Sequence, residues 1–148
     1  MADIGAAGPF SRFDGMDRTA VMVRGGGLCL SGKTEVLRFD GPGSFAQFPG
    51  ELALQCDAPE LPTQLWNVMV RRGQAQADLL IVEDETVPLP FAPDLLLLVL
   101  RGRFALTLSG TEPLVLATGE GLHLKGLVAP AYLAPSQANS LLLVTALR

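Results

Sequence analysis

Residues 27–39, GLCLSGKTEVLRF, decide the fold of this chain. Their first eight letters match the G-x-x-x-x-G-K-T spacing of a phosphate-binding loop. Such a loop needs a helix after it, because the helix N-terminus supplies N–H groups and a favourable dipole to the phosphate. Here residues 28–30 have the pattern of a strand, and residues 35–39 alternate like a second one before a glycine-rich break. We therefore interpret residues 31–34 as the tip of a β-hairpin and predict no nucleotide binding.

The same period-two alternation recurs along the whole chain between closely spaced turn formers. The predicted strands are 19–24, 27–30, 35–39, 52–56, 65–70, 104–108, 114–116 and 122–125. Only residues 74–80 and 136–143 have a pattern that allows a turn or two of helix. Short strands without β-α-β alternation predict an all-β fold, an antiparallel sandwich, jelly roll or barrel. The proline-rich residues 87–94 interrupt the rhythm, so we expect one domain over 1–148 with two β-rich halves, 1–86 and 95–148.

Composition excludes several classes of protein. With 49% hydrophobic and 18% charged residues, the chain is expected to fold compactly. The net charge of −4 and the scattered basic residues argue against nucleic-acid binding. The apolar runs end far short of the roughly 18 to 20 residues of a membrane span, and the first residues lack the pattern of a secretory signal. We therefore expect a cytoplasmic protein, in which Cys29 and Cys56 are reduced thiols.

The sequence contains few residues that could ligate a metal ion. His123 is the single histidine, and no H-x-H or H-x-x-E spacing surrounds it. Alternation places it with Lys125 on the face opposite Leu122 and Leu124, which favours a surface histidine. No G-x-S-x-G element supports a nucleophilic serine. The sequence therefore predicts no metal, no cofactor and no assigned catalytic residue.

Three segments in order carry a resemblance to a known family: GPFSRFDGMDRT (8–19), FAQFPGE (45–51) and LWNVMVRRG (65–73). Together they resemble the G-P-F-S-x-F-P-G-I-D-R-T, F-x-F-x-G-D and F-N-L-M-x-R-R elements of the HutD/Ves family. The resemblance covers the first half of the chain well and the second half loosely. It implies a bacterial, cupin-like β-barrel with two related halves and no established enzymatic activity, sometimes encoded beside histidine-utilisation genes.

The sequence departs from that family at its beginning. Family members begin with a strand and a W-K-N-G-G-G element, whereas this chain begins at the later region, so that first strand is expected to be missing. A missing strand leaves a sheet edge open, and open edges pair with other chains. We therefore expect a homodimer.

Four residues are candidates for binding a ligand: Arg18, Asn67, Met69 and Arg71. Alternation along 66–71 places Asn67, Met69 and Arg71 on one strand face, opposite Trp66 and its apolar neighbours. If that face lines the barrel, an amide, an adaptable thioether and cationic forks surround a site suited to a small carboxylate. The alternative is that Arg18 and Arg71 belong, with Asp17 and Arg72, to solvated ion pairs at strand ends.

Three functions stay open at this point. The first is a non-enzymatic protein that binds a small carboxylate metabolite and regulates amino-acid (histidine) utilisation or a stress response. The second is a metal-independent isomerase or lyase that uses arginines and carboxylates such as Glu51. The third is a structural or protein-interaction module whose barrel interior is filled. Two facing carboxylates in a pocket would favour the second function, and a barrel without a cavity would favour the third.

Overall fold

The computed structural model describes all residues 1–148 and contains β-strands but no helix. The chain divides into two compact units, Met1–Gln76 and Ala77–Arg148, each with eight strands. The first unit contains β1 (Ala2–Ile4), β2 (Gly8–Pro9), β3 (Met16–Arg24), β4 (Leu28–Ser31), β5 (Val36–Phe39), β6 (Phe45–Pro49), β7 (Gln55–Cys56) and β8 (Thr63–Arg71). The second contains β9 (Ala77–Glu83), β10 (Val87–Pro88), β11 (Asp94–Arg101), β12 (Arg103–Leu108), β13 (Leu114–Ala117), β14 (Gly121–Lys125), β15 (Ala131–Pro135) and β16 (Leu141–Leu147).

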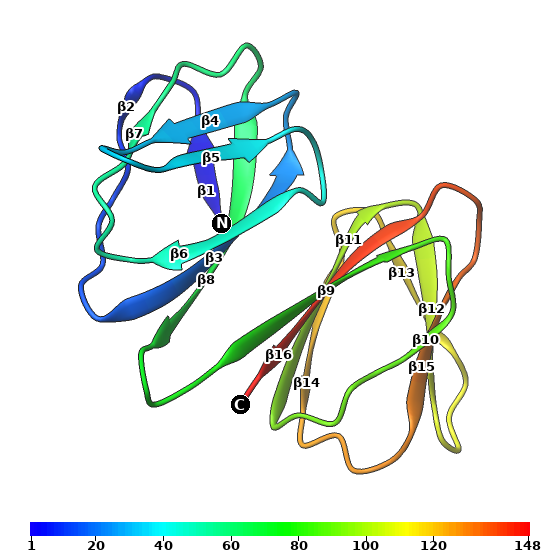
Figure 1. The fold of residues 1–148 in the computed structure, drawn as a ribbon. Coiled ribbons are helices and arrows are strands. Elements are labelled where there is room, and N and C mark those ends of the chain that lie inside the picture. The colour runs from blue at the N-terminus through cyan, green and yellow to red at the C-terminus, as the bar shows by residue number, and fades with distance from the viewer. The chain divides into compact units, whose positions relative to one another are not determined.

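Both units have the topology of a jelly roll. In the first unit, two antiparallel four-stranded sheets have the orders β1-β8-β3-β6 and β2-β7-β4-β5 (Figure 1). In the second, the orders are β9-β16-β11-β14 and β10-β15-β12-β13. Adding eight to each strand number of the first unit gives the second, so the halves are topologically equivalent. The all-β prediction with two related halves is confirmed.

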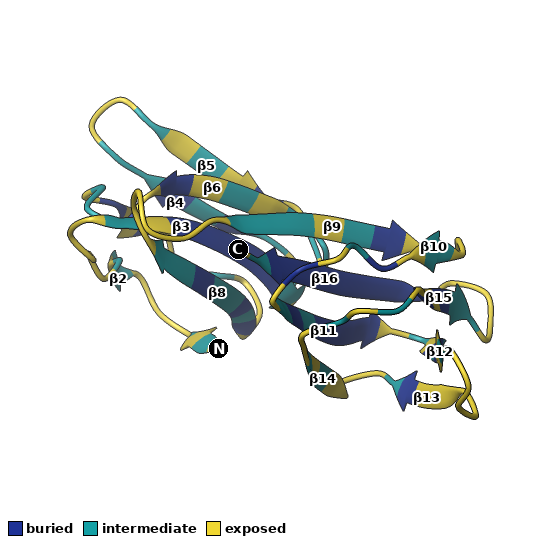
Figure 2. Cartoon of the chain, turned by 90° about the horizontal axis from the view of Figure 1, so that it is seen from below, coloured by how far each residue is buried: buried dark blue, intermediate teal, exposed yellow.

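Each unit has its own hydrophobic core. The first core contains Ala20, Met22, Leu28, Leu30, Phe39, Phe48, Leu54, Cys56 and Leu65. The second contains Leu95, Leu97, Val99, Phe104, Leu106, Leu133, Leu142 and Val144 among others. Buried residues gather along β3, β8, β11 and β16, which are the central strands of their sheets (Figure 2). Central strands are flanked on both edges, which is why their side chains are the most thoroughly enclosed.

The stretch that resembles a phosphate-binding loop is a β-hairpin, as predicted. β4 pairs antiparallel with β5, from Leu28 opposite Phe39 to Ser31 opposite Val36. The turn is closed by the Gly32 N–H, which donates to the carbonyl of Glu35 at 2.7 Å. Lys33 is exposed at its tip. With strands on both sides and no helix, this loop lacks the frame that binds phosphate.

The two weak helix predictions are wrong. Residues 74–80 lead into β9, and residues 136–143 lead into β16, and these strands pair with each other from Ala77 opposite Leu147 to Glu83 opposite Leu141. That pairing also moves the boundary between the halves. Residues 77–86 belong to the second unit because β9 completes its sheet, and β10 lies inside the region expected to be a linker.

The beginning of the chain covers part of the sheet edge that was expected to be open. β1 pairs with residues 63–65 of β8, and β2 pairs with β7. No strand pairs with residues 66–71 of β8 on that same side. The expected homodimer stays a prediction. No helix of the chain is long and apolar enough to span a bilayer.

Candidate functional site

The three sequence segments that carry the family resemblance meet inside the first unit. Arg18 on β3 lies directly opposite Met69 on β8, and Asn67 lies opposite Ala20, a core residue. Paired residues in a sheet share a face, so Arg18, Asn67 and Met69 all face the interior of the unit. The burial of Leu65 in the same core agrees with this orientation.

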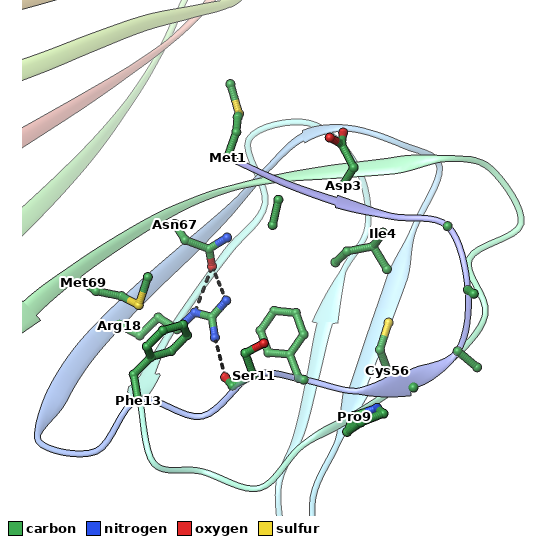
Figure 3. Close-up of a pocket in the computed structure, with 16 residues that line it drawn as sticks. Met1, Asp3, Ile4, Pro9, Ser11, Phe13, Arg18, Cys56, Asn67 and Met69 are labelled. Carbon is green, nitrogen blue, oxygen red and sulfur yellow. Dashed lines mark hydrogen bonds between the residues drawn. The ribbon is translucent and has the colours of Figure 1, made fainter.

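Arg18 is held by hydrogen bonds at three of its nitrogens. Its Nε and Nη2 both donate to Asn67 Oδ1, at 2.9 and 2.6 Å, and its Nη1 donates to the carbonyl of Ser11 at 3.1 Å (Figure 3). The residue is only 5% exposed. A guanidinium carries five N–H groups, so these contacts leave two without a hydrogen-bond partner in the protein.

Aromatic rings enclose the same guanidinium. Its Cζ lies 4.2 Å from the centroid of the Phe10 ring and 5.5 Å from those of Phe13 and Phe48. Each ring contributes cation–π attraction of about 0.5 to 2 kcal/mol, with the larger values at desolvated sites. Because the rings lie against the guanidinium, a polar ligand can approach it along its N–H edge.

A tight loop contact holds Phe13 in this arrangement. The Phe13 N–H donates to the carbonyl of Gly50 at 2.8 Å, and the Gly50 N–H donates to the carbonyl of Met16 at 2.7 Å. A Cβ at Gly50 would collide with the carbonyl oxygen of Phe13. Residue 50 must therefore be glycine for the loop to approach so closely.

Arg18 has no acidic partner. Arg12, Arg72, Arg101 and Arg148 each form an ion pair with a carboxylate, and Arg18 forms none. Burial lowers the pKa of Arg18 to about 10. The guanidinium is still protonated at neutral pH, so the unit contains a buried positive charge that no protein carboxylate neutralises.

A cavity of about 570 Å³ lies beside Arg18, within the usual size range of small-molecule sites. We call it the Arg18 cavity. Residues 1–11, which we call the strap, form much of its wall, and side chains from β3, β7 and β8 complete it (Figure 3). Its lining consists of residues 1–11, Phe13, Arg18, Cys56, Asn67 and Met69.

The second unit is an internal comparison for this site. Its strands β11 and β16 are equivalent to β3 and β8, and they fill their interior with Leu95, Leu97, Val99, Leu142 and Val144. No charged residue belongs to that core. The polar constellation is therefore not a requirement of the jelly roll, because the same topology closes over an apolar interior.

The structure brings three of the four candidate residues together. Arg18, Asn67 and Met69 line the Arg18 cavity, whereas Arg71 is exposed at the end of β8 and does not. The ion-pair alternative describes Arg72 instead, which donates to Asp17 Oδ1 at 2.7 Å and to both Glu51 carboxylate oxygens at 2.7 and 2.9 Å. The Arg72 guanidinium lowers the pKa of Glu51 to about 2.

His123 lies on the surface of the second unit, as alternation predicts. Its Nε2 lies 2.6 Å from Asp94 Oδ1, and Leu122 and Leu124 on the other face pack against the core. No group of three or more His, Cys, Asp or Glu side chains is arranged to hold a metal ion.

The residues that sequence reasoning missed are Phe10, Ser11, Phe13 and Phe48. All four lie in the first two segments of the family resemblance. Their spacing has no chemical signature of its own, because rings and a backbone carbonyl gain a role only when β3 brings Arg18 beside them. The order of the three segments was the available signal.

Comparison with solved structures first defines the class. A cupin 2 conserved barrel domain protein from Leptotrichia buccalis superposes with a TM-score of 0.64 at 14% identity, over 99% of this chain and 81% of that one. The protein YlbA from Escherichia coli superposes with a TM-score of 0.68 at 9% identity, over 99% of this chain and 74% of that one. The chain has a cupin-type β-barrel fold.

The family is more specific. The HutD family model matches residues 1–141, and the chain belongs to this family. HutD from Pseudomonas fluorescens SBW25, solved in a formate condition, has a TM-score of 0.77 at 20% identity, over 99% of this chain and 76% of that one. The conserved protein PA5104 from Pseudomonas aeruginosa PAO1 has a TM-score of 0.82 at 23% identity, over 99% and 78%. A search of curated protein sequences finds no significant match.

Proposed function

We propose that this HutD-family protein binds a small carboxylate metabolite in the Arg18 cavity, without catalysis, and that binding serves a regulatory role in amino-acid utilisation. The observation that carries this proposal is the buried Arg18 guanidinium, which has no acidic partner and lines a cavity of about 570 Å³. A buried cation without a counter-charge is costly, and a ligand carboxylate would remove that cost on binding.

The geometry favours a carboxylate over other anions of similar charge. Asn67 Oδ1 fixes the guanidinium through Nε and Nη2, and the rings of Phe10 and Phe13 lie against it. A planar carboxylate can accept from the remaining N–H groups in the plane of the guanidinium, where two parallel hydrogen bonds are strongest. The amide of Asn67, whose Nδ2 makes only a long contact of 3.5 Å to Leu65, is a further donor.

The proposed regulatory role rests on membership of the HutD family and on the absence of a pair of carboxylates placed for acid–base catalysis in the cavity. The only carboxylate among the residues lining the cavity is that of Asp3, which is exposed. Glu51, the carboxylate considered for acid–base chemistry, is engaged by Arg72 and does not line the cavity. A low pKa of about 2 also makes Glu51 a poor proton acceptor at neutral pH.

Thermal unfolding with a series of carboxylates tests the proposal. A ligand at 100 times its Kd stabilises the folded state by about 2.7 kcal/mol, which raises the melting temperature by several degrees. We expect such a rise with wild-type protein and none with Arg18→Met. Arg71→Met, which removes an equal charge outside the cavity, is the control and should respond like the wild type. A rise that survives in Arg18→Met, or no rise with any carboxylate, would overturn the proposal.

A further inference from the structure

Arg72 joins the three sequence segments that carry the family resemblance. It belongs to the third segment, and its Nε donates to Asp17 Oδ1 in the first segment at 2.7 Å. Its Nη1 and Nη2 donate to the two carboxylate oxygens of Glu51 in the second segment, at 2.7 and 2.9 Å. Isolated surface ion pairs contribute little, but a bidentate pair within a network of charges fixes the geometry of its partners. Arg72 therefore holds together chain segments that lie far apart in the sequence.

The same side chain restrains the loop that carries Phe13. We call residues 12–16, between β2 and β3, the Phe13 loop. Arg72 Nη2 donates to the carbonyl of Met16 at 3.1 Å, and the Gly50 N–H donates to the same carbonyl at 2.7 Å. The C-terminal end of the Phe13 loop is thus held by a backbone contact and by the Arg72 guanidinium together.

Phe13 connects this restraint to the Arg18 cavity. Its ring lines the cavity and lies 5.5 Å from Arg18 Cζ, and the residue is 36% exposed, so the ring separates the guanidinium from solvent (Figure 3). A guanidinium attracts an anion more strongly where water is kept away from it, because the local dielectric constant is lower. Arg72 itself does not line the cavity.

Resting on the carboxylate binding proposed above, we propose that Arg72 is a positioning residue for the Arg18 cavity. It restrains the Phe13 loop, which keeps Phe13 against the Arg18 guanidinium and so strengthens carboxylate binding, although Arg72 does not touch the ligand. Without Arg72 the loop opens more often, because local opening depends on the few contacts that hold a segment. Water then reaches Arg18, and the affinity for a carboxylate falls.

Solvent exchange of the Arg18 Nε–H, followed by NMR, measures this restraint in the unliganded protein. The resonance is assigned as the one that Arg18→Met removes. This N–H donates to Asn67 Oδ1 at 2.9 Å in a residue that is 5% exposed, so its exchange requires a local opening. We expect Arg72→Gln to accelerate the exchange at least about tenfold.

Two control variants remove the same charge without removing the restraint. Arg71→Gln acts one residue away, at an exposed position at the end of β8. Arg101→Gln removes a comparable surface contact from the second unit, where Arg101 donates to Glu83 Oε1 at 3.1 Å and to the carbonyl of Asn139 at 2.8 Å. Both controls should leave the exchange of the Arg18 Nε–H unchanged.

Titration calorimetry with pentanoate as the probe measures the consequence for binding. We expect Arg72→Gln to weaken pentanoate binding about three- to tenfold, and the two control variants to bind like the wild type. In a Phe13→Ala background, Arg72→Gln should have almost no further effect on affinity, because the ring that transmits the restraint is gone.

The outcomes separate this inference from the proposed function. Unchanged exchange in Arg72→Gln would overturn the inference, and so would an affinity loss that is as large in the Phe13→Ala background as in the wild type. Exchange that rises only by the factor by which global unfolding rises in urea would make Arg72 a structural residue, and would also overturn it. Failure of pentanoate to bind the wild type, with exchange still accelerated in Arg72→Gln, would overturn carboxylate binding and leave the restraint of Phe13 by Arg72 standing.

Discussion

Replacing Arg18 with methionine separates a binding role from a structural one. Methionine keeps an unbranched chain of similar reach but removes the charge and every donor. If Arg18 were there to hold the fold, its loss would resemble the breaking of a buried ion pair, which costs about 3 to 5 kcal/mol. If Arg18 is kept for a ligand, its loss in the unliganded protein should cost much less.

The magnitude follows from the surroundings of the guanidinium. Burial lowers the pKa of Arg18 to about 10 from an ordinary value of about 12.5, and at about 1.4 kcal/mol per tenfold change this is a desolvation cost of about 3 kcal/mol. Methionine removes that cost. It also removes charged hydrogen bonds to two acceptors, Asn67 Oδ1 and the Ser11 carbonyl, worth about 3 kcal/mol together, and cation–π contacts with three rings, worth about 1.5 kcal/mol together at the lower end of their range. The terms nearly cancel, so we expect a change in unfolding free energy of less than about 2 kcal/mol.

Urea unfolding followed by fluorescence of the single tryptophan, Trp66, measures this change, and calorimetry measures the loss of carboxylate binding. In Arg18→Met, Asn67 Oδ1 loses the donors that it has in the wild type. The double variant Arg18→Met/Asn67→Leu removes this unpaired acceptor as well, so it should be at least as stable as Arg18→Met. Destabilisation by more than about 4 kcal/mol in both variants would refute the reasoning, because it would make Arg18 a structural residue.

The remaining predictions concern the loop, the surface ion pairs and the hairpin. Gly50→Ala should lower the unfolding free energy by about 1 to 3 kcal/mol and weaken carboxylate binding. The control Gly102→Ala, at a φ of 79° in the second unit, should destabilise the protein without changing its affinity for carboxylates. Equal effects of the two substitutions on affinity in calorimetry would contradict this. Because Arg72 lowers the pKa of Glu51 to about 2, the contribution of Glu51 to stability is complete above its unfolded pKa of about 4.3 and is lost as the pH falls towards 2. Glu51→Gln should therefore flatten the stability profile between these pH values in urea titrations, and an unchanged profile would argue against the pair. Lys33→Ala should leave both stability and ligand affinity unchanged, and thermal stabilisation of the wild type by ATP would show that the hairpin binds nucleotide after all.

Most of the strands that the sequence predicted have one face more buried than the other, although β3, predicted at residues 19–24, is buried throughout residues 18–22. Residues 28–30 and 104–108 alternate because their other face is polar or half-buried, and period two is visible in such strands. β11 and β16 were not predicted as strands. They are central strands whose residues are apolar almost throughout, so their sequences show no period-two alternation. The boundary between the halves was misplaced because the proline-rich residues look like a linker, whereas a long-range pairing with the last strand assigns β9 to the second unit.

The candidate site was predictable in part for a related reason. Alternation along β8 correctly placed Asn67 and Met69 on one face, since a single strand fixes that relation. It also placed Arg71 there, but the strand leaves the cavity before that residue. Whether Arg18 is buried or solvated depends on Phe48 of β6 and Asn67 of β8, which lie far from Arg18 in the sequence, so no local pattern could decide it.

A crystal structure of the protein grown with pentanoate tests the central claim most directly. Carboxylate binding at Arg18 predicts electron density for the ligand in the Arg18 cavity, with its carboxylate oxygens about 2.7 to 2.9 Å from the guanidinium nitrogens and its tail against the strap. An empty cavity at a concentration that saturates binding in calorimetry, or ligand density elsewhere with Arg18 still bonded only to Asn67 and Ser11, would contradict it.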